Sequence, residues 1–288
     1  VLEFRAGKQR LRNAAKPKVS GGGIMAQMKY FYELTIASSP HAHSPVTTHV
    51  IMRDVVSALT PALLGSCYVF GFRALMVTLV SMAACVFFEW AYCKLMKKPS
   101  SVYDGSALVT GMLLAFVCPV TIPYWTIILG DLFAIVLVKQ LFGGIGCNFV
   151  NPALAGRAFL FSWPVLMSNW VKPGFANAPG ILSTADVVTG ATPLSAMHQG
   201  AMPDVKLLDL FLGNVGGCLG ETSALLLLIG FAYLLIRKVV RPLIPLAYIG
   251  TVAVLTFLFP QGNDRLMWMD YQVLSGGFLL GALFMATD

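Results

Sequence analysis

The sequence predicts an all-α polytopic membrane protein, and its composition and its long apolar runs are the observations that predict it. Of the 288 residues, 57% are hydrophobic and only 11% are charged, whereas about 25% of residues are charged in an ordinary soluble domain. The apolar runs approach the roughly 20 residues that a helix needs to cross a bilayer. These features exclude a conventional soluble globular enzyme.

Eight membrane crossings are expected from the apolar runs. Several runs are only about 15 residues long and contain Gly or Pro, so we expect tilted, buried or broken helices among them. The glycine-rich segment LLDLFLGNVGGCLGE, residues 207–221, predicts a re-entrant half-helix instead of a ninth crossing. The expected crossings are Val55–Phe72, Ala74–Cys93, Ser106–Val120, Tyr124–Val138, Ala153–Met167, Thr222–Ile236, Leu243–Phe259 and Val273–Ala286.

The chain divides into five expected segments. Residues 1–24 are a basic leader without an apolar core, which we interpret as non-native or disordered. Residues 25–53 are a cytoplasmic N-terminal segment, residues 54–167 a first helical half, residues 168–206 a polar loop, and residues 207–288 a second half that we expect to be truncated at its C-terminus. A weak internal similarity between GSALVTG, residues 105–111, and SGGFLLG, residues 275–281, predicts that the two halves are related, as in transporter-like bundles.

The net charge of +7 comes from Lys and Arg residues that cluster between the apolar runs, which indicates membrane topology and not nucleic-acid binding. Lys and Arg stay on the cytoplasmic side of short loops. With the N-terminus in the cytoplasm, the inner segments hold most of these residues, Lys139 and Arg157 among them. The loop Ser168–Lys206 is then extracytoplasmic. The outer segments hold only Arg73, Lys172, Lys206 and Arg265.

The polar stretch TADVVTGATPL, residues 184–194, interrupts this apolar chain. Gly190 and Ala191 leave steric space just before the hydroxyl of Thr192, while Pro193 fixes the turn beyond it and Asp186 supplies an acceptor upstream. A phosphate group could approach the backbone here. An ordinary surface turn is the alternative that composition favours.

A second candidate site lies in GGIGCNFVNPA, residues 143–153. Asn148 and Asn151 are spaced i, i+3, which would put two amides on one face if a helix began there. Amides both donate and accept hydrogen bonds, as the edge of an isoalloxazine ring requires. In the alternative interpretation, Asn151 caps the following helix, whose first residue is Pro152.

Two acidic residues fall inside apolar runs, where ionisable side chains are costly and mark candidate functional sites. Asp131 in IILGDLFAI and Glu89 in VFFEWAY are candidates for handling a coupling ion, and a structural hydrogen bond is the alternative for each. Asp104 and Glu221 lie near helix ends, where we expect them to act as caps.

No metal site is expected. The six cysteines show no CxxC or Cys/His spacing, so buried thiols are the expected state. His41, His43 and His49 cluster before the first crossing and could bind a metal, but a solvated or subunit-contacting segment is the simpler interpretation.

At Asp186–Thr192 the pattern D-x-x-[ST]-G-A-T resembles the flavinylation sequence of bacterial membrane redox subunits. From about Lys29 onward the chain resembles the RnfD/NqrB family, and within it the RnfD branch. The motifs that carry this resemblance are SSPH (38–41), IMRDVVSALTPALL (51–64), YDGSALVTGMLLA (103–115), NPALAGRAFLF (151–161), GGCLGETS (216–223) and FMATD (284–288).

The resemblance implies a bundle of about ten helices in two related halves, and it implies two flavins. An exported flavin transferase would join FMN through its phosphate to Thr192, with Thr189, Gly190 and Ala191 at the matching positions before it. A noncovalent riboflavin would lie near Asn148 and Asn151, at the opposite face of the membrane.

The resemblance also implies a multi-pass subunit of an Rnf complex in the bacterial inner membrane. Electrons from reduced ferredoxin would reach FMN through the flavoprotein RnfG and continue through riboflavin to the NAD-reducing subunit RnfC, coupled to Na⁺ or H⁺ movement. We expect no NAD site in this subunit, because its sequence holds no P-loop or dinucleotide fingerprint. The alternatives are an NqrB-like subunit of a quinone-reducing sodium pump and a flavin-free solute channel or permease.

Overall fold

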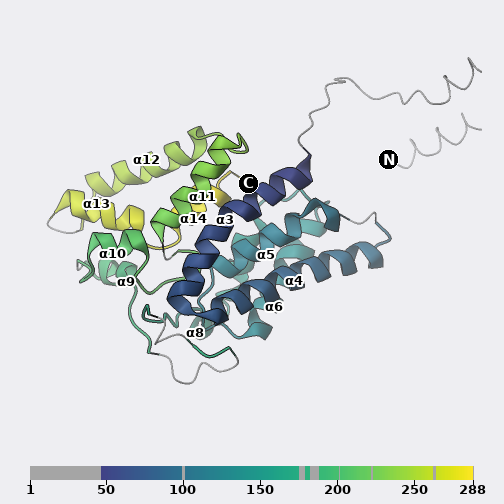
Figure 1. The fold of residues 1–288 in the computed structure, drawn as a ribbon, viewed down its shortest axis with the longest axis horizontal. Helices are drawn as coiled ribbons and strands as arrows, with labels where there is room; N and C mark the ends of the chain where they lie inside the picture. Colours follow the sequence, from purple (N-terminus) through teal and green to yellow (C-terminus); the bar gives the residue numbers. More distant parts are fainter. Residues whose placement is uncertain are drawn as a thin grey trace, which may run out of the picture. The chain divides into compact units, whose positions relative to one another are not determined.

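The computed structural model describes residues 47–98, 101–174, 179–181, 188–200, 202–221, 223–261 and 264–287. Within these ranges the chain consists of helices joined by loops, with one isolated antiparallel bridge between Val171 and Thr189 (Figure 1). The predicted all-α class is therefore confirmed for the described residues. The basic leader 1–24, His41, His43 and Asp186 lie outside them.

Two long helices open the described chain. Helix α3 spans Thr48–Phe70 and helix α4 spans Phe72–Leu95, and both are long and apolar enough to cross a membrane. They are joined by Gly71, whose φ of 75° is in the left-handed region that glycine adopts most easily. Helix α3 begins about two turns before the expected start, and Asp54 in those turns pairs with Arg237, which directly follows a later helix.

The remaining helices of the first half pack around α4. Helix α5 (Ser106–Phe116) follows the short turn η1 (Val102–Asp104), and helix α6 (Tyr124–Leu132) continues into the π-helical segment η2 (Phe133–Gln140). Helix α7 (Pro152–Leu160) packs against α5, α6 and η2. The expected crossing Ala153–Met167 is wrong as a continuous helix, since it breaks after Leu160 and resumes only as α8 (Pro164–Met167).

The second half contains shorter helices. They are α9 (Pro193–His198), α10 (Leu207–Leu212), α11 (Ala224–Ile236), α12 (Leu243–Leu258), α13 (Arg265–Leu274) and α14 (Phe278–Leu280), which continues into the π-helical η4 (Gly281–Met285). The expected continuous crossing Val273–Ala286 is wrong, because the chain leaves the helix at Ser275 and Gly276 has a φ of 66°. Only the first part of the expected re-entrant half-helix is helical, since Gly213 ends α10 with a φ of 100°.

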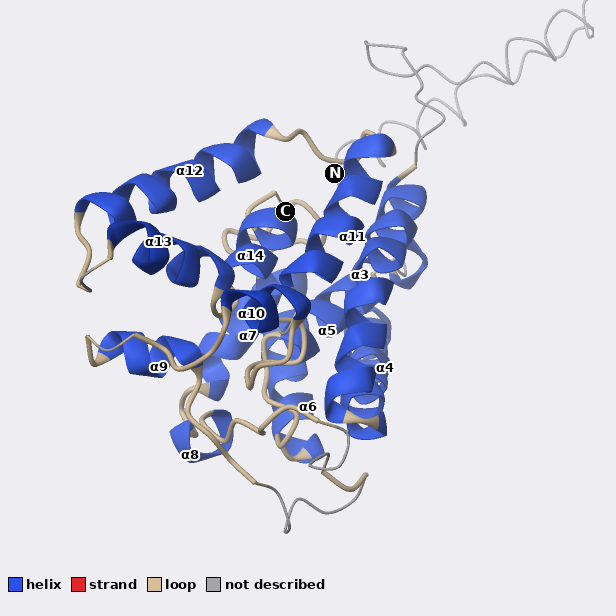
Figure 2. Cartoon of the chain, turned by 60° about the vertical axis from the view of Figure 1, so that its left-hand side comes forward, coloured by secondary structure: helices blue, strands red, loops and turns tan. Residues whose placement is uncertain are grey.

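The two halves meet through close backbone contacts. Helix α11 lies beside α3 (Figure 2), and a Cβ atom added to Gly230 would overlap the carbonyl oxygen of Ala58. The glycine-rich segment before α11 pairs with the end of α5: Leu219 N donates to Cys118 O at 3.1 Å and Gly220 N to Phe116 O at 2.9 Å. The buried end of α5 thus has carbonyls satisfied by the other half, as an interrupted helix inside a bundle requires.

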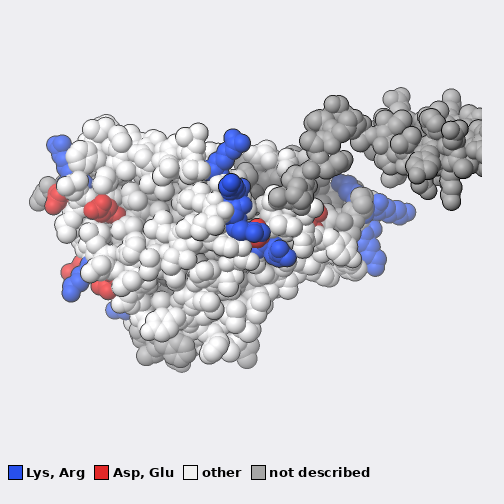
Figure 3. All heavy atoms as spheres, turned by 45° about the horizontal axis from the view of Figure 1, so that its top comes forward, with Lys and Arg blue, Asp and Glu red and all other residues white. Residues whose placement is uncertain are grey.

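Large areas of the surface consist of exposed apolar side chains. Only Pro245 is buried in α12, while Leu243, Leu246 and Val254 are 77%, 63% and 57% exposed. Figure 3 shows a wide surface without charged side chains, with the described Lys, Arg, Asp and Glu residues gathered in a few groups. Surfaces of this kind are covered by lipid or by partner subunits. Helices α5, α11 and α12 are apolar but shorter than a full crossing, so the count of eight crossings stays a prediction.

Candidate functional site

Thr192 stands at the N-terminal end of α9. Its Oγ1 accepts a hydrogen bond from Ser195 N at 3.3 Å, and the Ser195 hydroxyl donates to Thr192 O at 2.8 Å. The residue is half-buried and lines a cavity of about 110 Å³. Thr192 therefore borders a hollow instead of being enclosed in a packed helix.

The residues before Thr192 are held by the loop strand beside them. Thr189 forms the bridge with Val171, and Gly190 N donates to Trp170 O at 3.0 Å. A Cβ atom on Gly190 would lie 3.1 Å from Cγ of Lys172, so the absence of a side chain makes room for the lysine. Lys172, Gly190 and Ala191 line a second cavity of about 210 Å³.

The first cavity is bounded on its other side by an ion pair that joins the two halves. Arg157 of α7 and Glu221 of the segment before α11 line it together with Thr192, and Arg157 Nη1 lies 3.4 Å from Glu221 Oε1. The expectation that Glu221 caps a helix is wrong, because Ser223 caps α11 through its bond with Leu226 N. Asp104 is no cap either, since Gly105 occupies the N-cap position of α5 without a side-chain bond.

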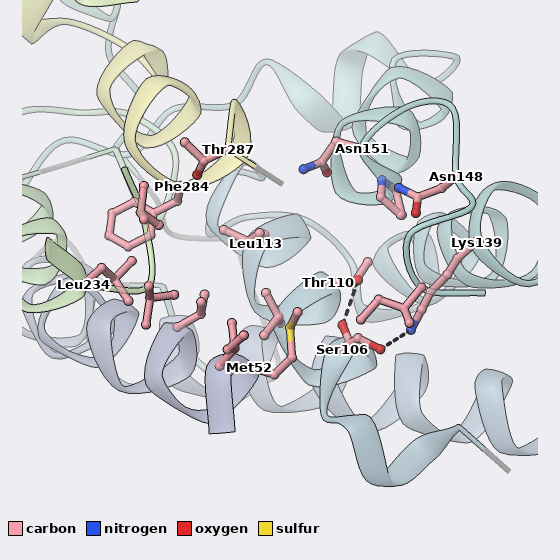
Figure 4. A pocket seen from close by; sticks show the side chains of 17 residues that line it. Met52, Ser106, Thr110, Leu113, Lys139, Asn148, Asn151, Leu234, Phe284 and Thr287 are labelled. Atoms are coloured by element: carbon pink, nitrogen blue, oxygen red, sulfur yellow. Dashed lines mark hydrogen bonds between the residues drawn. The ribbon is translucent and has the colours of Figure 1, made fainter. Parts of the chain in front are cut away.

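The two asparagines line a different cavity, of about 210 Å³ (Figure 4). Asn151 Oδ1 accepts from Ala153 N at 2.9 Å and Leu154 N at 3.3 Å, which confirms the capping interpretation. Asn148 precedes the helix and donates to Val150 O at 3.0 Å. The idea that both lie on one helix face is therefore wrong, but the loop still brings both amides to one cavity. Ser106, Thr110, Lys139 and Thr287 are its other polar lining residues.

Glu89 is engaged in a buried polar cluster beside the asparagine cavity. Lys139 Nζ donates to Glu89 Oε2 at 2.8 Å and to Ser106 Oγ at 2.7 Å, and Gln140 Nε2 donates to Glu89 Oε1 at 2.9 Å. The side chains of Lys139 and Glu89 are 3% and 0% exposed. Lys139 and Gln140 come from the π-helical η2, and such segments are frequent at functional sites.

Asp131 of α6 is also fully buried, and it contacts α4 on the N-terminal side of Glu89. Its Oδ1 accepts from Ser81 Oγ at 2.7 Å and from Cys85 Sγ at 3.2 Å. Its Oδ2 has no hydrogen-bond partner among the described residues. Ser81, Cys85 and Glu89 are spaced by four residues, so α4 carries one polar stripe facing α5, α6 and η2.

The asparagine cavity and the polar loop lie at opposite ends of the α3–α4 pair. Ile51 and Met52 from the start of α3 line the cavity. At the other end, Arg73 Nη1 donates to Ile181 O at 2.8 Å in the loop.

Three basic residues used to orient the chain have partners inside the protein, and of these Arg73 and Lys139 are buried and Arg157 is half-buried. Arg73 Nε donates to Val120 O at 2.8 Å, Lys139 pairs with Glu89, and Arg157 pairs with Glu221. Counting them as loop charges was therefore wrong, because they lie in α4, η2 and α7.

Sequence reasoning missed Arg157, Trp170 and Lys172 as neighbours of Thr192. Arg157 was visible as a charge within an apolar run, which is a signal of a buried role. Trp170 and Lys172 carried no such signal, because a polar loop normally contains residues of both types.

Comparison with known proteins places the chain in a family. Residues 35–288 match the NQR2, RnfD, RnfE family. The D subunit of the Na⁺-translocating ferredoxin:NAD⁺ oxidoreductase complex of Acetobacterium woodii is 45% identical over 260 residues, covering 88% of this chain and 77% of that protein. The proton-translocating counterpart of Clostridium ljungdahlii is 39% identical over 269 residues, covering 88% and 78%.

A third relative extends the same pattern. The D subunit of the ion-translocating oxidoreductase complex of Rhodobacter capsulatus is 37% identical over 279 residues, covering 87% of this chain and 77% of that protein. Matches of this identity and extent show the family of the chain. The chain belongs to the NQR2, RnfD, RnfE family.

Proposed function

We propose that this chain is the D subunit of an ion-translocating ferredoxin:NAD⁺ oxidoreductase complex, with the other Rnf subunits as its partners. The similarity to the D subunits of such complexes supports the assignment. The observation that carries the electron-transfer role is the half-buried Thr192, which lines one cavity together with the half-buried Arg157, while Gly190 and Ala191 before it line a second cavity.

The cofactor proposed at Thr192 is FMN, joined as a phosphoester. The site fits a tethered group: Thr192 lines one cavity, Gly190 and Ala191 line the other, and Arg157 Nε is buried without a partner among the described residues. Cavities of about 110 and 210 Å³ are below the roughly 300–1,000 Å³ of sites that enclose a drug-sized ligand. The ring would thus lie partly outside them. FMN supplies electron transfer when bound, while the chain supplies position and charge.

Lys172 is the residue proposed to hold the phosphate. Its side chain runs past Gly190, two residues before Thr192, and an ammonium group binds phosphate as a mobile point charge. Asp186, the acidic position of the motif, lies outside the described residues.

The cofactor proposed at the asparagine cavity is a noncovalent riboflavin. Asn148 and Asn151 offer amide edges, Ser106 and Thr110 offer hydroxyls, and Leu113, Leu234 and Phe284 form apolar walls (Figure 4). A few convergent polar groups in an apolar hollow are typical of sites for planar cofactors. This cavity also encloses only part of such a ligand.

Asp131 and Glu89 are proposed to serve the coupling ion. Ser81 has one hydroxyl proton and two acceptors within reach, Asp131 Oδ1 at 2.7 Å and Gly111 O at 2.8 Å. A proton or cation bound at Asp131 would free the Ser81 hydroxyl to donate to Gly111 O alone. It would also give Asp131 Oδ2 a partner. The relatives include Na⁺-translocating and proton-translocating complexes, so the ion is left open as Na⁺ or H⁺.

The proposed topology has eight crossings in this part of the chain, a cytoplasmic N-terminus and an extracytoplasmic Thr192 loop in the bacterial inner membrane. Lys94 lies in the last turn of α4 and Lys97 and Lys98 follow it, while Arg237 pairs with Asp54 near the start of α3. Basic residues from two parts of the chain therefore share the end that holds the asparagine cavity. Positive charge at that end supports a cytoplasmic position. Electrons would then enter from RnfG outside and leave to RnfC inside, after a flavin transferase has matured the protein.

The test uses the purified complex from a host that contains the flavin transferase. Ferredoxin-dependent NAD⁺ reduction is expected, together with a fluorescent band of this chain after SDS electrophoresis. Quinone reduction in place of NAD⁺ reduction would indicate an NqrB-like pump. A chain without fluorescence, in a host whose transferase modifies another protein, would indicate a flavin-free channel or permease.

A further inference from the structure

Arg157 lines the same small cavity as Thr192. Arg157 comes from the middle of α7, and Thr192 is the residue directly before α9. The cavity has a volume of about 110 Å³, and its charged lining residues in the described part of the chain are Arg157 and Glu221. Gly277 lines it as well, and a Cβ atom there would lie 2.5 Å from Glu221 Oε1 and 3.6 Å from Arg157 Nη1. A group that enters this cavity beside Thr192 therefore meets one guanidinium and one carboxylate.

The volume of this cavity suits a phosphate group and is too small to enclose a flavin ring. About 10–15 Å³ of such space holds one water molecule, so a volume of about 110 Å³ accommodates several oxygen-sized groups, as the oxygens of a phosphate require. Sites that enclose a drug-sized ligand measure roughly 300–1,000 Å³. In a phosphoester at Thr192 the phosphorus is bonded directly to Oγ1, so the phosphate is the part of the cofactor that comes nearest to these walls.

The Arg157 guanidinium is incompletely satisfied. Its contact with Glu221 measures 3.4 Å, longer than the roughly 2.7–2.9 Å of a strong charge-assisted bond. Its Nη2 lies 3.8 Å from the thiol sulfur of Cys218, and its Nε is buried without a partner among the described residues. An arginine has five donors in a planar fork that matches the oxygens of a phosphate. Donors therefore remain for an anion in the cavity.

A second cation lies in the neighbouring cavity. Lys172 lines the hollow of about 210 Å³, and Pro193 and Gly216 line both hollows. The two cavities are therefore adjacent, with one basic residue in the wall of each. Lys172 supplies a mobile point charge, whereas the guanidinium of Arg157 supplies donors in a fixed geometry.

We propose that Arg157 binds the phosphate of the flavin nucleotide as it is joined to Thr192, and that Glu221 holds the guanidinium at the cavity until then. The inference rests on the proposed function, because it needs the phosphoester at Thr192. In the joining step Thr192 Oγ1 forms a bond to phosphorus while the phosphoric anhydride bond of a flavin dinucleotide breaks. The hydroxyl proton passes to a general base, and the other nucleotide leaves as a monophosphate. A guanidinium beside the phosphate oxygens stabilises the negative charge that they carry during this transfer.

Substitutions of the pair separate phosphate binding from a purely structural role. Arg157→Gln removes the cation and is expected to slow the attachment of FMN by about tenfold, because one charged hydrogen-bond donor is lost. Arg157→Lys keeps the charge without the planar fork, so its rate should lie between those of the wild type and Arg157→Gln. The double variant Arg157→Gln/Glu221→Gln leaves no carboxylate unpaired. It should therefore recover the stability of the protein but not the rate of attachment.

The experiment follows attachment in a host that makes the complex first and the flavin transferase only after induction. The complex is purified at timed intervals and digested, and mass spectrometry measures the fraction of the Thr192 peptide that carries FMN. Arg237→Gln is the matched control, because Arg237 also pairs with a buried carboxylate, 3.0 Å from Asp54, and does not line the cavity of Thr192. It is expected to be modified at the wild-type rate.

The outcomes separate the role of Arg157 from the proposed function. Attachment at the wild-type rate in Arg157→Gln, or full recovery of the rate in the double variant, would overturn the role of Arg157 and leave the proposed function intact. Wild-type protein that stays unmodified, while the transferase modifies another protein, would overturn the proposed function itself. If no variant that lacks Arg157 accumulates, Glu221→Gln decides: removal of the competing carboxylate should speed attachment, and an unchanged or slower rate would reject the role.

Discussion

The ion pair of Lys139 and Glu89 shows how strongly the stability of the fold depends on a single buried residue. Lys139 Nζ lies 2.8 Å from Glu89 Oε2, and both side chains are almost completely buried. Lys139 Nζ also donates to Ser106 Oγ, and Gln140 Nε2 donates to Glu89 Oε1. Two charges removed from solvent are tolerated only when they are paired and hydrogen-bonded. Removal of one partner leaves the other charge buried alone.

Glu89→Gln is therefore expected to destabilise the protein by about 3–5 kcal/mol, the usual cost of an unpaired buried charge. The double variant Glu89→Gln/Lys139→Met removes both charges and should recover much of that loss. Thermal unfolding in one detergent, compared across wild type, single and double variants, measures the coupling. Additive effects of the two substitutions would mean that the pair is not formed.

Asp131→Asn is expected to abolish ion transport while the fold is retained. The amide keeps the oxygen that accepts from Ser81 and Cys85, so the loss is that of an ionisable group and not of a packing contact. Ion uptake by proteoliposomes that contain the complex, driven by ferredoxin oxidation, is the measurement. Unchanged uptake per electron transferred would remove Asp131 from the ion path.

The sequence could predict that these acids are buried, but not what they contact. Asp131 and Glu89 stand within apolar runs, which is a local property. Their partners Ser81 and Lys139 lie 50 residues away along the chain, and only the packing of α4 against α6 and η2 brings them together. For the same reason Arg157 was taken for a loop charge, since Glu221 is 64 residues away.

At the scale of elements, glycine determines how closely helices approach. A Cβ atom on Gly111 of α5 would lie 2.8 Å from both Met82 Cα and Ser81 O of α4, and Gly230 brings α11 even nearer to α3. Small residues at helix contacts let backbones come close enough for extensive van der Waals contact.

Gly230→Ala should destabilise the bundle by about 1–3 kcal/mol, because the added methyl group overlaps Ala58 O and forces the backbones apart. Gly250→Ala is the matched control, since nothing lies within 4 Å of a Cβ atom there in α12. It is expected to be neutral or slightly stabilising. Melting temperatures of the two variants in the same detergent test the difference, and equal losses would show that helix propensity alone is responsible.

Helices were easier to predict than their ends. Apolar runs locate α4, α5, α11 and α12 nearly correctly, because burial and lipid contact both select apolar residues. The start of α3 was placed too late, at Val55, because Arg53 and Asp54 interrupt the apolar run, although Arg237 pairs with Asp54. The break between α13 and α14 was missed because Gly276 and Gly277 are ordinary helix-contact residues by sequence.

For the whole molecule, the arrangement separates two candidate cofactor sites along the α3–α4 pair. Cys147 is exposed, whereas Cys85, Cys93, Cys118 and Cys218 are buried and Cys67 is partly buried. Because Cys147 lies in the loop next to Asn148, it is a natural reporter for the side on which the asparagine cavity opens.

A membrane-impermeant maleimide is expected to label Cys147 in inverted membrane vesicles but not in right-side-out ones. Lys172 is exposed in the other loop, so Lys172→Cys in a Cys147→Ser background should show the reverse pattern. Labelling of both positions from the same side would contradict the proposed topology and, with it, the inward path of electrons.

The central claim is that the Thr192 hydroxyl carries FMN, and peptide mass spectrometry of the Ser168–Lys206 loop tests it most directly. The wild-type peptide from a host with an active flavin transferase should carry the mass of FMN less one water, located at Thr192. Ser195→Ala, which removes the neighbouring hydroxyl bonded to Thr192 O, should keep that mass, and Thr192→Ala should lose it. An unmodified wild-type peptide, or a flavin located at another residue, would contradict the account.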